Sequence, residues 1–174
     1  RQRQMCIRDR MRYLNSFWTF LQKENLVKDN PVARIESLRI ESTIKKAFSA
    51  QGLEALRMAC VRPRDRALIE FLYATGVRVS ELCSLNVGDI DLYKQEFKVM
   101  GKGRKERHLY ISDGSCFHLY RYLRWRMSKE GLTMEELASK PLFVSAKKPY
   151  SRMTVAGVQY LVKNLGKKAG VGNV

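Results

Sequence analysis

Apolar residues recur along most of the chain with the spacing of helices. Leu14, Phe17, Trp18 and Leu21 fall at i, i+3, i+4 and i+7, which places them on one face of a helix. The tetrapeptide KDNP at residues 28–31 ends this pattern, because the residue before a proline avoids the helical region. The first segment is therefore predicted to be one helix followed by an irregular exit.

Helix signals return after residue 47. Ser49 can cap a helix over residues 50–60, since its hydroxyl can accept from a first-turn N–H. Pro63 suits the first turn of a helix that continues to Thr75, and Gly76 can adopt the left-handed conformation that ends it. Further helices are predicted over residues 78–85, 113–128 and 152–170.

A strand pattern is found in the middle of the chain. Phe97 and Val99 alternate with polar residues, as do Leu109 and Ile111, and the polar loop GKGRK at residues 101–105 separates the two runs. This arrangement predicts a β-hairpin, on which His108 faces outward. The run PLFVS at residues 141–145 is expected to form a third strand. The fold class is therefore mostly α with a small antiparallel β-sheet (α+β).

The patterns also suggest where the chain divides. Residues 1–10 show no apolar periodicity, and we expect them to be a non-native extension outside the fold. Residues 34–47 carry mixed charge with weak periodicity, which is typical of a linker between domains. Two folded parts are thus expected, at 11–33 and 48–174.

Charge points to the class of partner. The 33 basic and 17 acidic residues give a net charge of +16, which favours binding to a polyanion such as DNA. No apolar run approaches the roughly 18 residues of a spanning segment, and no signal-peptide pattern is visible, so we expect a cytoplasmic protein without a membrane partner. The four cysteines are widely spaced and predict reduced thiols, with no metal site and no cofactor.

Two groups of basic residues are candidates for phosphate contacts. Arg78 follows a helix end, with Glu81 three positions later. The hairpin carries Lys102, Arg104, Lys105 and Arg107. A guanidinium can donate two parallel hydrogen bonds to a phosphate and keeps its charge. The alternatives are a surface ion pair between Arg78 and Glu81, and an ordinary polar turn.

A third basic group has a simpler explanation. His118 and Arg121 form an H-x-x-R spacing, which occurs in some phosphate sites, but they lie on an arginine-rich amphipathic helix. We interpret them as part of a solvated basic face. The two glycine-rich stretches fail the G-x-x-x-x-G-K-[ST] pattern, which argues against a nucleotide-binding P-loop.

Two motifs together resemble one known family. The stretch ATGVRVSELCSLNVGDI at residues 74–90, followed by VMGKGRKERHLYIS, is similar to the catalytic domain of the tyrosine recombinases, the phage integrase family, and most like its Xer-type members. The resemblance covers roughly residues 11–174 and implies the recombinase fold, incomplete at its carboxyl end. It also implies that residues 11–33 are the last helix of an N-terminal core-binding domain.

The resemblance implies a chemistry and residue roles. Such enzymes cleave and rejoin DNA through a 3′-phosphotyrosine intermediate without metal or cofactor, and they act on double-stranded DNA as tetramers of protomers. Arg78 and Lys102 would be catalytic, the first binding the phosphate and the second acting as general acid. Glu81 would support Arg78, while Arg104, Lys105 and Arg107 would bind DNA.

The resemblance is not complete. The family's later H-x-x-R box and tyrosine nucleophile have no counterpart in order, so we expect no nucleophile in this chain and no cleavage by this chain alone. Two alternatives stay open at this point. One is a DNA-binding relic or regulator without catalysis. The other is a helix-turn-helix regulator, which leaves the lysine hairpin unexplained.

Overall fold

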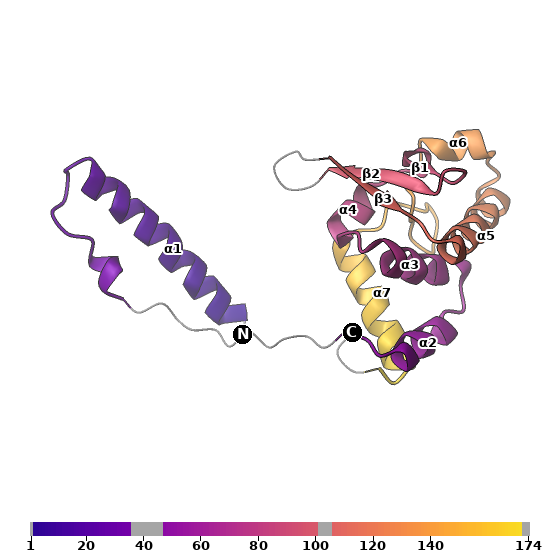
Figure 1. Ribbon diagram of the computed structural model, residues 1–174, viewed down its shortest axis with the longest axis horizontal. Coiled ribbons are helices and arrows are strands. Elements are labelled where there is room, and N and C mark those ends of the chain that lie inside the picture. The colour runs from indigo at the N-terminus through magenta and orange to yellow at the C-terminus, as the bar shows by residue number, and fades with distance from the viewer. Residues whose placement is uncertain (1, 36–46, 101–105, 172–174) are drawn as a thin grey trace. The chain divides into compact units, whose positions relative to one another are not determined.

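The structure is a computed structural model of the protein that describes residues 2–35, 47–100 and 106–171 (Figure 1). The chain divides into two compact units, Arg1–Lys46 and Ala47–Val174. The division falls one residue from the boundary expected from the sequence. The assignment of the two parts to named domains stays a prediction.

The first unit contains one long helix. Helix α1 spans Gln2–Lys23, and the 3₁₀ helix η1 spans Pro31–Arg34. The Asn30 side chain caps η1 by accepting from the N–H groups of Val32 and Ala33. Sequence analysis set residues 1–10 outside the fold, but α1 begins at Gln2 and continues through them without a break. Whether that stretch is native stays a prediction.

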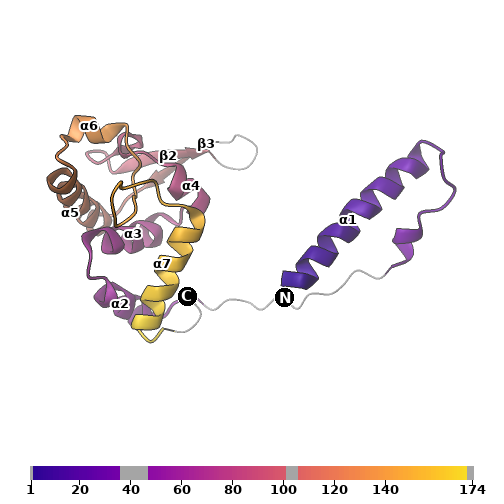
Figure 2. The ribbon, with the colours of Figure 1, turned by 180° about the vertical axis from the view of Figure 1, so that it is seen from behind.

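The second unit is mainly helical (Figure 2). Its α-helices are α2 (Ala50–Ala59), α3 (Pro63–Thr75), α4 (Val79–Ser84), α5 (Asp113–Glu130), α6 (Met134–Ala138) and α7 (Val155–Lys168), with the 3₁₀ helix η2 at Val87–Asp89. Ser49 caps α2 by accepting from the Gly52 N–H, and Gly76 ends α3 with φ +58, as the sequence predicts. Figures 1 and 2 show α7 crossing the unit from α4 to α2.

The sheet is antiparallel with strand order β1-β2-β3, formed by Ile90–Asp91, Glu96–Met100 and Glu106–Tyr110. The predicted hairpin is confirmed in its two strands, while its tip at 101–105 lies outside the described residues. The third strand was predicted wrongly. Residues 141–145 form isolated bridges, at Pro141 and Val144, and β1 takes the place beside β2.

Aromatic packing between helices and sheet builds the core. Helices α3 and α5 lie side by side, and α3 also contacts β3 (Figure 1). Phe71 of α3 lies 5.1 Å from Phe97 of β2 and 6.0 Å from Phe143, measured between ring centroids. Tyr122 of α5 stacks on Phe143 at 5.5 Å. The predicted class, mostly α with a small antiparallel sheet, is confirmed.

Helix α5 is amphipathic, as the sequence predicts, and its buried face also contains an arginine. Its buried face carries Leu119, Tyr122, Leu123 and the nearly inaccessible Arg126. The Arg126 guanidinium donates to the Glu130 carboxylate at 2.6 Å and to the Pro141 carbonyl at 2.6 Å. Arg126 is thus a structural residue of the core, because its burial is compensated by an ion pair and carbonyl acceptors.

Candidate functional site

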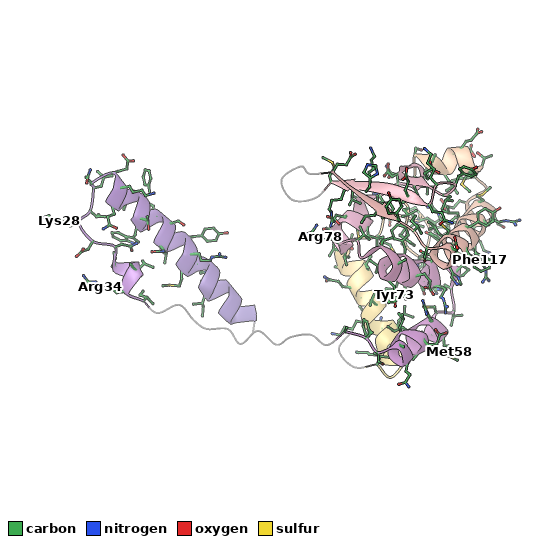
Figure 3. All side chains as sticks on the ribbon, in the orientation of Figure 1. Lys28, Arg34, Met58, Tyr73, Arg78 and Phe117 are labelled. Atoms are coloured by element: carbon green, nitrogen blue, oxygen red, sulfur yellow. The ribbon has the colours of Figure 1, made fainter. Side chains whose placement is uncertain are left out.

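The backbone around Arg78 fixes where its side chain emerges. Gly76 reverses the chain at the end of α3, with its N–H donating to the Leu72 carbonyl. Two residues later, Arg78 is the N-cap of α4, with an extended backbone (φ −66, ψ 145). Its side chain is 60% exposed, and Figure 3 shows it at the edge of the unit beside α4. The guanidinium is therefore available to an external ligand.

Glu81 holds Arg78 at two points. Its Oε2 accepts from the Arg78 backbone N–H at 3.0 Å, and its Oε1 accepts from the Arg78 Nη1 at 2.8 Å. The carboxylate is itself only 10% exposed, so little water competes for its oxygens. The hydrogen bond to the N-cap backbone is one half of a capping box, which satisfies a free N–H at the start of α4.

Arg107 approaches the same carboxylate from the hairpin. Its Nη2 lies 3.0 Å from Glu81 Oε1 and 2.9 Å from Oε2, and its side chain is 42% exposed. One negative charge is thus shared by two arginines, one at the N-cap of α4 and one on β3. This contact links the base of the hairpin to the residue that caps α4.

Strand parity indicates the face of the sheet from which the Arg107 side chain starts. Sequence analysis grouped Arg107 with the DNA-binding residues of the hairpin tip, although Leu109 was expected to face inward. Residues two apart on a strand share a face. Arg107 pairs with the buried Val99 across the hairpin, so its side chain starts from the inner face of the sheet. The inward direction of Arg107 could thus be predicted from the sequence, but its partner Glu81 on α4 could be identified only from the fold.

The charges around Glu81 determine its protonation. Burial alone would raise the pKa of this carboxyl. The hydrogen bonds from the Arg78 side chain and backbone, together with the charge of Arg107, outweigh burial and lower the pKa below its ordinary value. Glu81 is therefore an anion at neutral pH and cannot act there as a proton donor.

Arg152 holds the other end of α4. Its Nη1 donates to the carbonyls of Cys83 and Leu85 at 3.0 and 2.9 Å, and its Nη2 donates to the Asn86 side chain. The last carbonyls of a helix have no partner within the helix, so a cation there satisfies them. The sequence gives no sign of this role for Arg152, because 67 residues separate it from Leu85 along the chain.

The remaining predicted site residues cannot be placed. Lys102, Arg104 and Lys105 lie outside the described residues, between the ends of β2 and β3. Their roles stay predictions. In the described part of the chain, no group of three or more His, Cys, Asp or Glu side chains is arranged to hold a metal ion.

The arrangement suits the binding of an anion by Arg78. Among the described residues, one of its guanidinium nitrogens, Nη1, is bonded to the protein, which leaves further N–H donors facing solvent. A guanidinium that is bound to a carboxylate through one nitrogen and exposed at its other N–H donors can donate two hydrogen bonds to a phosphate or carboxylate. The site can therefore bind negative charge in a fixed orientation.

Comparison with known proteins places these features in a family. The model of the phage integrase family matches residues 48–173. Tyrosine recombinase XerC from Bacillus licheniformis is 37% identical over 160 residues, which cover 89% of this chain and 52% of that protein. The chain thus spans about half the length of the curated relatives it matches.

Solved structures agree with this comparison. The crystal structure of XerA recombinase matches with a TM-score of 0.63 at 26% identity, covering 92% of this chain and 54% of that one. The Tn1549 transposon integrase in complex with circular intermediate DNA matches with a TM-score of 0.71 at 18% identity, covering 96% and 58%. The second likeness concerns the fold alone. Within the described residues, no helix is both long and apolar enough to cross a membrane.

Proposed function

The chain belongs to the phage integrase family, and from that membership we propose that it binds double-stranded DNA as part of a tyrosine recombinase. The function proposed is site-specific DNA strand cleavage and rejoining through a 3′-phosphotyrosine intermediate in the complete protein. The observation that carries this proposal is the exposed Arg78, held by a carboxylate that is itself bound by Arg107. The net charge of +16 supports a DNA partner.

Arg78 is proposed to bind the non-bridging oxygens of the scissile phosphate. Charge on these oxygens grows in the transition state, and a donor already in place stabilises it without reorganisation. Glu81 would orient Arg78, and Arg107 would hold Glu81 through contacts of 2.9 and 3.0 Å. For Arg107 this positioning role replaces the direct DNA contact expected from the sequence.

Lys102 is proposed as the general acid, with Arg104 and Lys105 contacting the DNA backbone. A lysine ammonium, with an ordinary pKa of about 10.4, remains protonated beside DNA phosphates and can protonate the leaving 5′-oxygen. No metal or cofactor is needed for this step. We further propose that residues 11–33 belong to an N-terminal core-binding domain and that residues 34–47 link it to the catalytic domain. The proposal also includes assembly of protomers on DNA and action in the cytoplasm.

DNA binding by the 174-residue chain tests the first part. Fluorescence anisotropy with a labelled duplex should give an affinity that falls steeply with salt. Arg78→Ala should lower the slope of log K against log salt by about one, as expected for the loss of one phosphate contact. Arg124→Ala is the charge-matched control, since Arg124 lies on α5 with its guanidinium over the exposed Tyr120 ring. Equal slopes for the wild type and Arg78→Ala would contradict the proposal.

A chimera tests the catalytic roles. Residues 48–171 of this chain would replace the matching segment of Bacillus licheniformis XerC, and covalent adducts would be counted on a nicked duplex. Arg78→Ala should lower adduct formation by about 10²–10³-fold, the usual effect of losing one charge-stabilising donor. Lys102→Ala should also be slow, but a 5′-thiolate leaving group should rescue it, because a thiolate needs no acid. Rescue of Arg78→Ala instead would reverse the two assignments.

A further inference from the structure

A second basic site lies at the end of α3 opposite to Arg78. A cavity of about 210 Å³ opens between the α2–α3 connection and α5, and it is lined by Arg62, Arg66, His118 and Arg121 together with Cys60, Val61 and Pro63. Helix α3 has 13 residues and is thus about 20 Å long, so the cavity is well separated from Arg78. In Figure 3, Phe117, the neighbour of His118 on α5, lies on the other side of the unit from Arg78.

The cavity carries an excess of positive charge. Arg66 pairs with Glu70 at 2.9 Å, but Glu70 is also bound by Arg57 at 2.8 Å, so its single charge is divided between two arginines. Within the described part of the chain, Arg62 and Arg121 form no ion pair with a carboxylate. Counting the described residues, the walls of the cavity therefore hold two cations without a bonded counter-charge.

The excess of positive charge affects the protonation of His118. The imidazole is half-buried on α5 and lines the cavity. Burial and the neighbouring charges of Arg66, Arg121 and Arg57 lower its pKa, against the opposing effect of Glu70. A bound anion would offset these cations and favour the imidazolium form, which can donate a hydrogen bond.

Two of the cationic side chains, Arg66 and Arg121, are held by neighbouring groups. The Arg121 guanidinium lies 5.7 Å from the centroid of the Phe117 ring, in cation–π geometry. Arg62 precedes Pro63, which occupies the first turn of α3 and fixes the local backbone. Arg66 is oriented by its ion pair with Glu70. Side chains from α3, its N-cap and α5 thus converge on one small space.

We propose that this cavity binds a phosphate group, with the guanidinium groups of Arg62, Arg66 and Arg121 as donors and the His118 imidazole beside them. A dianionic phosphate, either free or as a terminal monoester, matches the two uncompensated charges. The volume of about 210 Å³ is below the ~300–1,000 Å³ of typical small-molecule pockets, so the cavity takes the phosphate group and leaves the rest of a monoester outside. This site is separate from the DNA-binding role proposed for Arg78 and does not depend on it.

The two histidines of the chain allow a direct test by NMR. The imidazole C–H signals of His118 and His108 would be followed during titration of the 174-residue chain with inorganic phosphate. We expect a saturable shift of the His118 signal and a higher His118 pKa in the presence of phosphate. His108 lies on the exposed face of β3 and serves as the internal control, with no matching change.

Variants locate the binding. Arg62→Gln and Arg121→Gln should each weaken phosphate binding by about tenfold or more, since hydrogen bonds to charged groups contribute about 1.5–3 kcal/mol. Arg124→Gln removes an exposed charge one turn along α5 and should leave the affinity unchanged. Circular dichroism of each variant checks that the helices remain folded.

Two oligonucleotides, one with and one without a 5′-terminal phosphate, distinguish a terminal monoester from free phosphate as the ligand. A short single strand with a 5′-terminal phosphate should shift His118 more strongly than the same strand without it if a terminal monoester is the ligand. If inorganic phosphate shifts His118 and neither strand does, the ligand is the free anion. Parallel shifts of His118 and His108 with inorganic phosphate, or phosphate titrations unaffected by both Arg62→Gln and Arg121→Gln, would overturn the proposal.

Discussion

Replacing Glu81 by glutamine removes one negative charge from between Arg78 and Arg107 while keeping the size of the side chain. The change disturbs the guanidinium contacts of the carboxylate, at 2.8 Å to Arg78 and 2.9 Å to Arg107. The amide oxygen of glutamine can still accept from the Arg78 backbone N–H. The substitution therefore tests the charge-assisted part of the arrangement and leaves the capping hydrogen bond possible.

The magnitude follows from the exposure of the partners. A hydrogen bond to a charged group contributes about 1.5–3 kcal/mol when the loss is uncompensated. The side chains of Arg78 and Arg107 are 60% and 42% exposed, so water replaces much of each lost contact. Each guanidinium contact is then worth about 0.5–1 kcal/mol. We expect Glu81→Gln to lower the free energy of unfolding by about 1–2 kcal/mol at pH 7.

The effect should depend on pH with a definite sign. The pKa of Glu81 is lowered in the folded chain, so its stabilisation is fully present above the unfolded-state value of about 4.3. The stabilisation is lost as pH falls through the lower folded-state pKa. The difference in stability between wild type and Glu81→Gln should therefore shrink as the pH is brought below about 4.

Urea unfolding measures both effects. The fluorescence of Trp125, which lies in the second unit, would be followed in a Trp18→Phe background. The matched control is Glu106→Gln, because Glu106 forms an exposed ion pair with Lys98 at 3.4 Å and should change stability by less than about 0.5 kcal/mol. If Glu81→Gln is no more destabilising than Glu106→Gln, or if its effect is the same at pH 7 as at a pH well below 4, the reasoning is refuted.

Three further predictions concern the second unit. Gly88→Ala should destabilise it by about 1–3 kcal/mol in urea unfolding, because the new Cβ would lie 2.9 Å from the Ala138 carbonyl oxygen, whereas Gly114→Ala meets no atom within 4 Å and should be neutral or stabilising. Arg126→Ala should cost about 3–5 kcal/mol in the same assay, since it leaves the partly buried Glu130 carboxylate and two backbone carbonyls without their donor, and a loss below 1 kcal/mol would contradict this. Burial and the charge of Asp65 raise the pKa of Cys60 to about 11, so mass spectrometry should find its alkylation at pH 8 about 100-fold slower than in urea.

Local signals in the sequence were sufficient for most of the helices and for the hairpin. Ser49, Pro63 and Gly76 mark helix ends because each acts on the backbone of its own segment. The stretch PLFVS was misread for the opposite reason. Its apolar residues Leu142, Phe143 and Val144 are buried by α5 and the core, and an apolar run of this length does not reveal whether a strand will find a partner.

The candidate site was only half predictable. The pair Arg78–Glu81 lies within one turn of the chain, so spacing was sufficient to propose it. Arg107 and Arg152 reach the same short helix from 26 and 67 residues away, and such contacts depend on how the hairpin and the segment before α7 pack. The cavity beside His118 and Arg121 was not predicted, because Arg62 and Arg66 line it from α3 and its N-cap, which are distant from α5 in the sequence.

Helix α4 has a consequence for how tightly a ligand can be held. With six residues it is too short to be stable in isolation, yet it is fixed by Glu81 at its start, by Arg152 at its end and by the buried Leu82 and Leu85 between them. The backbone of Arg78 is thus ordered when the protein folds. Binding an anion then needs to immobilise only the outer part of one side chain, an entropic cost of about 0.5–1.5 kcal/mol.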